Sequence, residues 1–301
     1  MKYSIIIPHY NRPDLIINTI ESFKDLKNKE IIIVDDVSKI ENIEKLKQNI
    51  SKLNFANNEI KLYESREKLY LPGARNKGME LAQGEWIYFI DDDDEATPQF
   101  IKWLNKSKQY KKYDFYRFPN IERLDGKNKM YIFKWWHKKY SAQVSTYLFN
   151  KAFLKQNKIK FNESILYGED FELMVQIFDL KKVKSKYIHC FAFYYNKFSN
   201  VDSMIRNKEI NPANKLDAIN ILLDSKYKNK NSYALSFLVG DFFFSYKNKA
   251  YSNEIQTYQV YQSFYEKIKP KFIDWWNIYI PWKIQYFSFK KYLKRNKDKF
   301  K

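Results

Sequence analysis

The sequence predicts an α/β fold with a mostly parallel central sheet, flanking helices and a C-terminal helical extension. Three observations support this prediction. Short apolar runs alternate with helix-like segments four times in the first 110 residues. Polar and acidic side chains directly follow three of these apolar runs. Beyond about residue 211, strand-like runs give way to helical, aromatic sequence.

The alternating elements of the first part of the chain follow from composition and spacing. Short runs rich in Ile and Val, or in aromatic residues, predict buried strands over residues 3–8, 30–34, 59–63, 86–90 and 113–118. Apolar residues at helical spacing predict helices over residues 13–26, 40–53, 73–83 and 97–110. Pro13 suits the first turn of the first helix, and Gly84 suits the end of the third.

The pattern is mixed between residues 127 and 195. Strand-like pieces at 130–133, 144–149 and 184–195 flank a helix predicted over 169–180. We therefore expect one domain over residues 1–205, followed by a helical, aromatic and basic region over 206–301.

Composition excludes several classes of protein. The 30% of charged residues and the lack of a long uncharged apolar run exclude a polytopic membrane protein and predict no transmembrane helix. The N-terminal apolar run is too short for a signal peptide. Cys190 is the one cysteine, which excludes intramolecular disulfides and cysteine-based zinc sites. The cytoplasm is therefore the predicted compartment.

The net charge of +19 favours a polyanionic partner. Nucleic acid, an anionic membrane and phosphorylated substrates all fit this charge. An alternative is compositional drift, since the chain is rich in Lys, Asn, Ile and Tyr and poor in Gly.

Three polar clusters follow the predicted strands where ligands bind in parallel sheets, beyond the carboxyl ends. They are Tyr10-Asn11-Arg12, Asp35-Asp36 and Asp91-Asp92-Asp93-Asp94. Asp91 and Asp93 are two residues apart, and such paired carboxylates suit a hard divalent cation. The alternative is a solvated acidic turn that caps the next helix.

Five motifs in this order resemble those of family 2 glycosyltransferases, which have the GT-A fold. They are SIIIPHYNR (4–12), EIIIVDD (30–36) with Ser38, GARNKG (73–78), GEWIYFIDDDD (84–94) through Pro98, and YGED (167–170). The resemblance covers roughly residues 3–196. It implies that residues 1–205 form a nucleotide-sugar-binding and catalytic domain, and that the aspartate run contains a DXD motif.

The resemblance also assigns roles to individual residues. A nucleotide-sugar would be bound by Pro8, Tyr10, Asn11, Asp35, Asp36, Arg75, Asp91 and Asp92. Asp93, together with Asp91, would hold a divalent metal, Mn²⁺ or Mg²⁺. Asp170 would be the general base of an inverting displacement, with Glu169 beside it. For these last two residues, the alternative is acidic charge that favours a helix N-terminus.

The chain departs from the family pattern at three places. Val37 stands where the family usually has glycine, and His9 stands where it usually has a small residue. Asn196, Lys197 and Phe198 occupy a segment where an Arg and a His are frequent, so a histidine metal ligand is not expected there.

Two further features concern the acceptor and the membrane. Trp135, Trp136 and His137 are candidate acceptor contacts, because aromatic faces suit sugar rings, although core packing explains them equally. Aromatic residues over 272–289 precede a basic tail over 290–301. This combination suits peripheral contact with an anionic membrane. A helical cap on the catalytic domain or a dimer contact is the alternative.

The expected function is thus hexosyl or N-acetylhexosaminyl transfer from a nucleotide-sugar, with UDP as the favoured nucleotide. The acceptor would be a glycan or a lipid-linked molecule in the assembly of bacterial surface polysaccharide, lipooligosaccharide or glycoprotein glycan. The enzyme would work in the cytoplasm or at the inner face of the cytoplasmic membrane. The alternatives are a non-catalytic GT-A-like scaffold and a basic nucleic-acid-binding protein, although no nucleic-acid partner is expected.

Overall fold

The structure is a computed structural model that describes residues 2–56, 59–106, 112–124, 127–129 and 143–197. The chain divides into two compact units, Met1–Glu163 with Leu180–Val201, and Ser164–Asp179 with Asp202–Lys301. We describe each unit by itself. The strand predicted at 130–133 and the C-terminal region predicted beyond residue 205 lie outside the described residues. The domain boundary at residue 205 stays a prediction.

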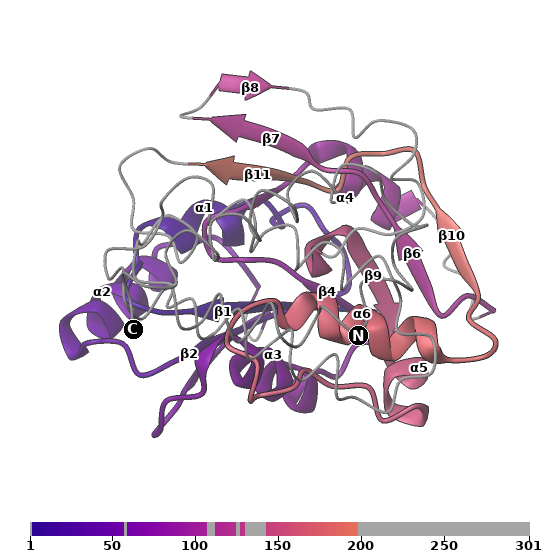
Figure 1. The fold of residues 1–301 in the computed structure, drawn as a ribbon. Helices are drawn as coiled ribbons and strands as arrows, with labels where there is room; N and C mark the ends of the chain where they lie inside the picture. The colour runs from indigo at the N-terminus through magenta and orange to yellow at the C-terminus, as the bar shows by residue number, and fades with distance from the viewer. Residues whose placement is uncertain (1, 57–58, 107–111, 125–126, 130–142, 198–301) are drawn as a thin grey trace, which may run out of the picture. The chain divides into compact units, whose positions relative to one another are not determined.

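A seven-stranded sheet forms the centre of the first unit, in the order β10-β6-β9-β4-β1-β2-β3 (Figure 1). Its strands are β1 (Tyr3–His9), β2 (Lys29–Asp35), β3 (Ile60–Glu64), β4 (Trp86–Phe89), β6 (Phe115–Arg117), β9 (Tyr147–Asn150) and β10 (Ser185–Tyr187). β9 is antiparallel to β4 and to β6, and the other pairings are parallel. The predicted mostly parallel sheet is confirmed.

Helices alternate with these strands as predicted over the first 110 residues. They are α1 (Leu15–Glu21), α2 (Ile40–Ser51), α3 (Tyr70–Leu81) and α4 (Pro98–Lys106). The short helix α5 (Lys151–Gln156) was not predicted. α1 is shorter than expected, because turns replace the helix after Glu21. In the second unit, α6 (Glu169–Asp179) agrees with the helix predicted there.

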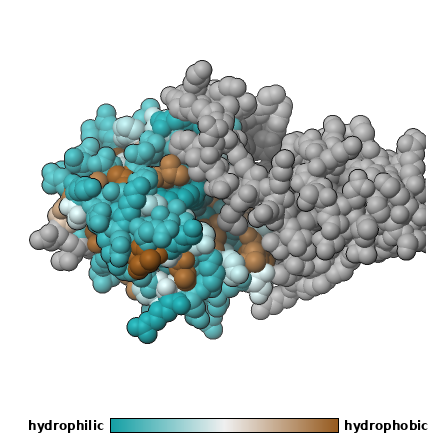
Figure 2. Space-filling view, turned by 90° about the vertical axis from the view of Figure 1, so that its left-hand side faces the viewer, coloured by the Kyte–Doolittle hydropathy of each residue, from teal (hydrophilic) through white to brown (hydrophobic). Residues whose placement is uncertain are grey.

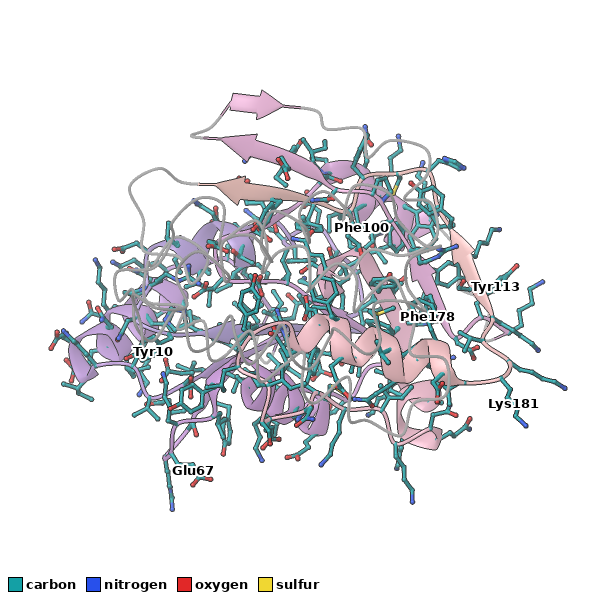
Figure 3. The ribbon with its side chains drawn as sticks, viewed as in Figure 1. Tyr10, Glu67, Phe100, Tyr113, Phe178 and Lys181 are labelled. Atoms are coloured by element: carbon teal, nitrogen blue, oxygen red, sulfur yellow. The ribbon has the colours of Figure 1, made fainter. Side chains whose placement is uncertain are left out.

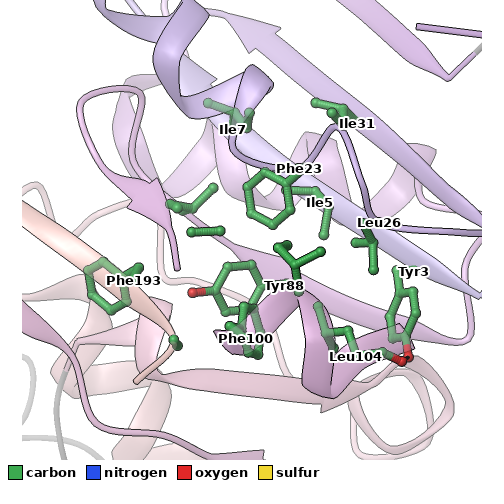
Figure 4. Close-up of a cluster of buried hydrophobic side chains, with 14 of the residues drawn as sticks. Tyr3, Ile5, Ile7, Phe23, Leu26, Ile31, Tyr88, Phe100, Leu104 and Phe193 are labelled. Atoms are coloured by element: carbon green, nitrogen blue, oxygen red, sulfur yellow. Dashed lines mark hydrogen bonds between the residues drawn. The ribbon is translucent and has the colours of Figure 1, made fainter. Parts of the chain in front are cut away.

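The main core lies between one face of the sheet and α1, α2 and α4. Alternate residues of the strands, such as Ile5 and Tyr88, meet Phe23 after α1 and Phe100 of α4 (Figure 4). On the opposite face α3 packs directly on β1. A Cβ at Gly78 would lie 2.3 Å from a methyl group of Ile6, so only glycine permits this close approach. Helices therefore cover both faces.

A second sheet was not predicted. It has four strands in the order β5-β11-β7-β8, drawn with β7 and β8 uppermost in Figure 1. The strands are β5 (Glu95–Ala96), β7 (Ile121–Leu124), β8 (Lys127–Lys129) and β11 (Phe193–Lys197). The single strand-like piece expected over 184–195 is wrong, because it divides into β10 of the large sheet and β11 of the small one. The periodicity of a sequence indicates that a segment is extended, but it does not indicate which strand the segment pairs with.

The piece predicted as a strand over 144–149 also differs from the structure. It begins with a 3₁₀ turn over Val144–Thr146, and β9 follows. The turn is closed by hydrogen bonds from the Thr146 amide (3.0 Å) and hydroxyl (2.7 Å) to the Gln143 carbonyl. These local bonds outweigh the extended preference of the β-branched residues.

Hydrophilic residues predominate on the coloured surface in Figure 2, and hydrophobic ones form small separate groups. No helix among the described residues is long and apolar enough to cross a bilayer.

Candidate functional site

The three polar clusters come together at one edge of the seven-stranded sheet, as predicted. β1 pairs in parallel with β2 and with β4, so His9 lies level with Asp35. The Asp36 amide donates to the His9 carbonyl at 2.9 Å, and the Ile90 amide donates to the Ile6 carbonyl at 3.1 Å. The segments after β1, β2 and β4 therefore start side by side. Ligands bind at this edge in parallel α/β sheets.

Residues Asp91–Asp94, here called the acidic loop, contain two kinds of carboxylate. Asp92 and Asp94 are 1% and 0% exposed. The side chains of Asp91 and Asp93 are 33% and 18% exposed. A ligand can therefore reach the carboxylates of Asp91 and Asp93, which are the two predicted metal ligands.

Burial changes the acidity of two members of the loop. Burial, aided by the charges of Asp91 and Asp92, raises the pKa of Asp93 to about 6, although Arg12 opposes the rise. Burial also raises the pKa of Asp94 well above its ordinary value, and the neighbouring carboxylates add to this effect.

Arg12 and His9 hold the acidic loop from the β1 side. One Nη of Arg12 donates to Asp93 Oδ2 at 2.9 Å, and the other donates to Asp92 Oδ1. His9 Nδ1 lies 2.9 Å from Asp92 Oδ2. Both oxygens of Asp92 are thus bound to protein side chains. Neither contact was predicted. The one signal in the sequence was His9 itself, which stands where the family usually has a small residue.

Arg75 approaches the acidic loop from α3. This arginine is 2% exposed, and its Nη2 donates to Asp91 Oδ1 at 2.9 Å. Its guanidinium carbon lies 5.3 Å from the centre of the Phe161 ring, within the range of a cation–π contact. Arg75 therefore lies between Asp91 and an aromatic ring, and its predicted contact with the nucleotide-sugar stays a prediction.

A second group of contacts surrounds Tyr10, which is 49% exposed and lies on the side of the molecule where α2 lies (Figure 3). Lys68 Nζ lies 3.3 Å from the centre of the Tyr10 ring and 2.9 Å from Asp36 Oδ2. The Leu69 amide donates to Asp36 Oδ1 at 2.6 Å. Lys68, which was not predicted to take part, thus contacts two predicted nucleotide-binding residues.

Asn11 and Asp35 organise the turn after β2. Ser38 donates to Asp35 through its amide (3.0 Å) and its hydroxyl, and the Asn11 amide donates to the Ser38 hydroxyl at 2.7 Å. Val37 has φ 59°, a left-handed conformation that favours glycine. This explains why glycine is usual at this position in the family that the motifs resemble. The turn keeps its shape because the surrounding hydrogen bonds hold it.

Asn196 of β11 holds the acidic loop from the small sheet. Its amide donates to Asp94 Oδ1 at 2.9 Å, and its side chain donates to the Asp93 carbonyl at 2.8 Å and to Glu95 Oε1 at 3.2 Å. Arg123 of β7 adds an ion pair to Glu95 at 3.1 Å. The sequence marked Asn196 only as a departure from the family, because β11 joins this loop by long-range pairing.

The remaining predicted residues lie in other places. Pro8 is buried within β1. Glu169 and Asp170 form the first turn of α6, and Glu169 is 7% exposed. They belong to the second unit, so their roles stay predictions. The proposed acceptor contacts Trp135, Trp136 and His137 lie outside the described residues.

The acidic loop offers a suitable donor set for a divalent cation. One oxygen of Asp91 and one of Asp93 each accept from an arginine, and no hydrogen bond from a described residue reaches the other oxygen. Carboxylate oxygens are the ligands that Mg²⁺ and Mn²⁺ prefer. Among the described residues no group of three or more His, Cys, Asp or Glu side chains could hold a metal ion. A cation here therefore needs further ligands from water or a bound substrate.

Comparison with known proteins gives the same family as the motifs. The model of Glycosyl transferase family 2 matches residues 4–168. The amylovoran biosynthesis glycosyltransferase AmsB of Erwinia amylovora is 38% identical over 128 residues, which are 42% of this chain and 38% of that protein. The poly(ribitol-phosphate) beta-glucosyltransferase of Bacillus spizizenii is 30% identical over 213 residues, 64% of this chain and 31% of that protein.

A third relative is the GalNAc(5)-diNAcBac-PP-undecaprenol beta-1,3-glucosyltransferase of Campylobacter jejuni. It is 30% identical over 203 residues, which are 62% of this chain and 62% of that protein. The chain thus spans less than two thirds of the length of each of these three relatives.

Solved structures share the fold. Residues 1–349 of Staphylococcus aureus TarS, in complex with UDP-GlcNAc, are 18% identical and superpose with a TM-score of 0.62, over 88% of this chain and 80% of that one. The same protein in complex with UDP gives a TM-score of 0.58, over 87% of this chain and 78% of that one. The fold is therefore the GT-A fold that the motifs predicted.

Proposed function

The chain belongs to glycosyl transferase family 2, and on this premise we propose that it is a glycosyltransferase that uses a nucleotide-sugar. The observation that carries the proposal is the meeting of Tyr10, Asp36 and the acidic loop at the ligand-binding edge of the sheet. UDP is the proposed nucleotide, a choice supported by the TarS complexes with UDP-GlcNAc and UDP.

The proposed acceptor is a hydroxyl group of a glycan or a lipid-linked molecule in bacterial polysaccharide assembly. The names of the relatives support this class, since one acts in amylovoran biosynthesis and another on an undecaprenol-linked glycan. The product would be a longer surface glycan. Contact of the C-terminal region with an anionic membrane remains a proposal beside it.

The nucleoside would bind against the segments after β1 and β2. The exposed ring of Tyr10 is available for stacking on a base, with Pro8 and Asn11 at its border. Asp36, or Asp35 in its place, would accept a hydrogen bond from the base. Lys68 lies over one face of the Tyr10 ring and pairs with Asp36, so a base that stacked on this face would have to displace it.

The sugar diphosphate would bind against the acidic loop. A divalent cation bound there by Asp93 and Asp91 would neutralise the charge that grows on the leaving diphosphate. Arg75 would support the same charge, and Asp91 would also contact donor hydroxyls. Both oxygens of Asp92 are already bound, so Asp92 could contact the donor only after losing its contact with His9 or Arg12.

The acceptor hydroxyl must lose its proton as it attacks the sugar. We assign the role of general base, which accepts this proton, to Asp170, with Glu169 beside it to orient the substrate. Attack by the hydroxyl on the face opposite to the leaving group makes the transfer a one-step inverting displacement. The sequence motif Gly168-Glu169-Asp170 supports the assignment.

A thermal-shift screen of UDP-, GDP- and dTDP-sugars with Mn²⁺, Mg²⁺ or EDTA tests the proposal. A donor that binds only the folded protein raises the apparent melting temperature. We expect a UDP-sugar with a divalent cation to give the largest rise and to be hydrolysed slowly without acceptor. No stabilisation and no hydrolysis with any donor, together with tight, salt-sensitive binding of single-stranded RNA, would favour the nucleic-acid-binding alternative.

A further inference from the structure

Arg12 joins two carboxylates of the acidic loop through one guanidinium group. Its two terminal nitrogens donate to Asp92 and Asp93, which are neighbours in the loop. The side chain is 29% exposed, so water screens the pairs only in part. The contact with Asp93 uses one oxygen of the main predicted metal ligand.

The backbone of Arg12 is fixed independently of these ion pairs. Its carbonyl accepts from the Leu15 and Ile16 amides, at 3.1 and 3.4 Å, where the chain enters α1. The arginine therefore reaches the acidic loop from an anchored position. Arg75, which pairs with Asp91, brings a second cation to the same loop.

We propose that Arg12 is a positioning residue that serves as the resident counter-ion of the acidic loop and weakens its affinity for a free divalent cation. The inference rests on the proposed function, since it takes the loop to receive a cation together with a nucleotide. Arg12 neutralises charge at Asp92 and Asp93 before any ligand arrives. A dication that approaches Asp93 meets this positive charge at close range.

A nucleoside diphosphate changes the balance. Its phosphate oxygens supply negative charge. They also supply the further ligands that a cation needs beyond the carboxylates of Asp91 and Asp93. The cation then binds with the nucleotide far better than alone. The device keeps the loop ordered without a cation and couples cation binding to the arrival of the donor.

Arginine and lysine at position 12 have separable effects. A lysine keeps the positive charge but has one ammonium group, which cannot span two carboxylates in the way a forked guanidinium does. Glutamine removes the charge and keeps a hydrogen-bond donor. If the charge controls cation affinity, Arg12→Lys behaves like the wild type and Arg12→Gln does not.

The test measures Mn²⁺ binding to the full chain by the loss of the free-ion EPR signal, with and without UDP. We expect the wild type to bind Mn²⁺ weakly alone and more tightly with UDP. Arg12→Gln should bind Mn²⁺ alone about tenfold more tightly than the wild type, because one adjacent positive charge is gone. Arg12→Lys should stay within about threefold of the wild type.

Lys77→Gln is the matched control, because it also removes one positive charge, and the contacts described for Lys77 are with Glu80 and the Tyr63 ring rather than with the acidic loop. It should leave Mn²⁺ binding unchanged. Circular dichroism confirms folding of each variant, and Arg12→Met removes the same charge should Arg12→Gln fail to fold.

Two results would overturn the inference. If folded Arg12→Gln or Arg12→Met binds free Mn²⁺ no more tightly than the wild type, while the wild type binds Mn²⁺ with UDP and hydrolyses a donor, the role of Arg12 is wrong and the proposed function stands. If no variant binds Mn²⁺ with or without UDP, and no donor is hydrolysed, both fail together.

Discussion

Neighbouring carboxylates in the acidic loop have different surroundings although their side chains are the same. Asp92 is buried with both oxygens bound to His9 and Arg12. Asp94 is fully buried, and one of its oxygens has no hydrogen-bond partner among the described residues. Asp91 and Asp93 are partly exposed. At the scale of the residue, only the exposed pair is suited to bind a ligand directly.

Asp93→Asn tests this division. The substitution keeps the size of the side chain but removes the charge that would attract a cation. Under the proposed function we expect the rate of donor hydrolysis at saturating donor to fall by at least about 100-fold, since cation stabilisation of a leaving group is worth several kcal/mol. Asp25→Asn, an exposed aspartate elsewhere, should keep the wild-type rate. A rate for Asp93→Asn close to that of the wild type contradicts the assignment.

Lys68→Met tests whether Lys68 occupies the nucleoside position. Its removal frees the ring of Tyr10 and one oxygen of Asp36, and an exposed cation–π contact is worth about 0.5–1 kcal/mol. We expect uridine to bind about threefold more tightly in calorimetry. Uridine rather than UDP is the probe, because loss of a lysine also weakens attraction for phosphate.

Lys47→Met is the control for that measurement, since Lys47 is an exposed lysine whose ion pair is with Glu64 rather than with Asp36. It should leave uridine affinity unchanged. Weaker uridine binding by Lys68→Met would instead assign Lys68 to direct contact with the nucleoside.

The sequence predicted which residues meet at the site but not how their side chains pair. Asp36 and Asp91 come together because parallel strands end at one edge, which apolar periodicity already implied. The bridge from Arg12 to Asp92 and Asp93, in contrast, depends on rotamers and on a separation of about 80 residues in the chain. A local sequence pattern contains no information on rotamers or on contacts between residues so far apart.

At the scale of the element, Glu30 connects four segments of the first unit. This carboxylate in β2 is 0% exposed and accepts from the Ser4 hydroxyl of β1 at 2.6 Å. It also accepts from the amides of Gln83 (2.5 Å) and Gly84 (3.0 Å) before β4, and from Lys61 Nζ of β3 at 2.7 Å. Burial raises its pKa, but the hydrogen bonds from Lys61, Ser4 and the Gln83 amide, together with the charge of Lys61, outweigh burial and leave the pKa below its ordinary value.

Glu30 therefore predicts an acid-dependent loss of stability. The lowered pKa means that the stabilisation is fully present above the ordinary glutamate pKa of about 4.3 and is lost as pH falls below it. Glu30→Gln should lower the free energy of unfolding at pH 7 by about 1–3 kcal/mol. It should also flatten the dependence of stability on pH below about 5. Urea denaturation from pH 3.5 to 7 measures both effects.

Glu80→Gln is the control for Glu30→Gln, because Glu80 is an exposed partner of Lys77 on α3. It should change stability by less than about 0.5 kcal/mol. A Glu30→Gln variant with the wild-type stability and pH profile would mean that the buried hydrogen bonds contribute little.

Asn196 of β11 holds the acidic loop from the small sheet, so a change at this residue should alter the site. Asn196→Asp replaces a donor with a carboxylate facing the Asp93 carbonyl and Glu95. Repulsion should displace the acidic loop and lower kcat/KM for the donor by about tenfold or more. Asn196→Ala, which removes only the side-chain hydrogen bonds, should have a smaller effect.

Asn105→Asp provides the comparison for Asn196→Asp. Asn105, in α4, bonds the Lys27 amide and the Asp25 carbonyl, away from the acidic loop. It should leave kcat/KM unchanged even if stability falls. Equal losses in Asn105→Asp and Asn196→Asp would show a general effect of stability.

The elements predicted best are those specified by their own sequence. β1 and β2 are continuous runs of apolar, β-branched residues, and the structure confirms both. β7, β8 and β11 contain polar residues and are defined by pairing with one another, so they were missed or merged. Pairing between distant strands follows from register, which periodicity does not contain.

At the scale of the whole molecule, the net charge of +19 predicts attraction to anionic surfaces. We expect the full chain to sediment with vesicles of phosphatidylglycerol and phosphatidylcholine at low salt. Most of it should be released at about 1 M salt, where the Debye length is about 3 Å. Vesicles of phosphatidylcholine alone are the control. Equal, salt-independent sedimentation with both kinds of vesicle would contradict an electrostatic contact.

The partners of the acidic loop are far from it along the chain, and this has a consequence for folding. His9 and Arg12 precede their carboxylate partners by 80 to 83 residues, and Asn196 follows Asp93 by 103. Such contacts close large loops, whose entropy must be overcome before the contacts can stabilise anything. The pairing of β1 with β4 closes a loop of the same length, since Tyr3 lies beside Trp86. We therefore expect the site to be completed together with this pairing, and a fluorescent nucleotide that binds there would report the joining of β1 and β4.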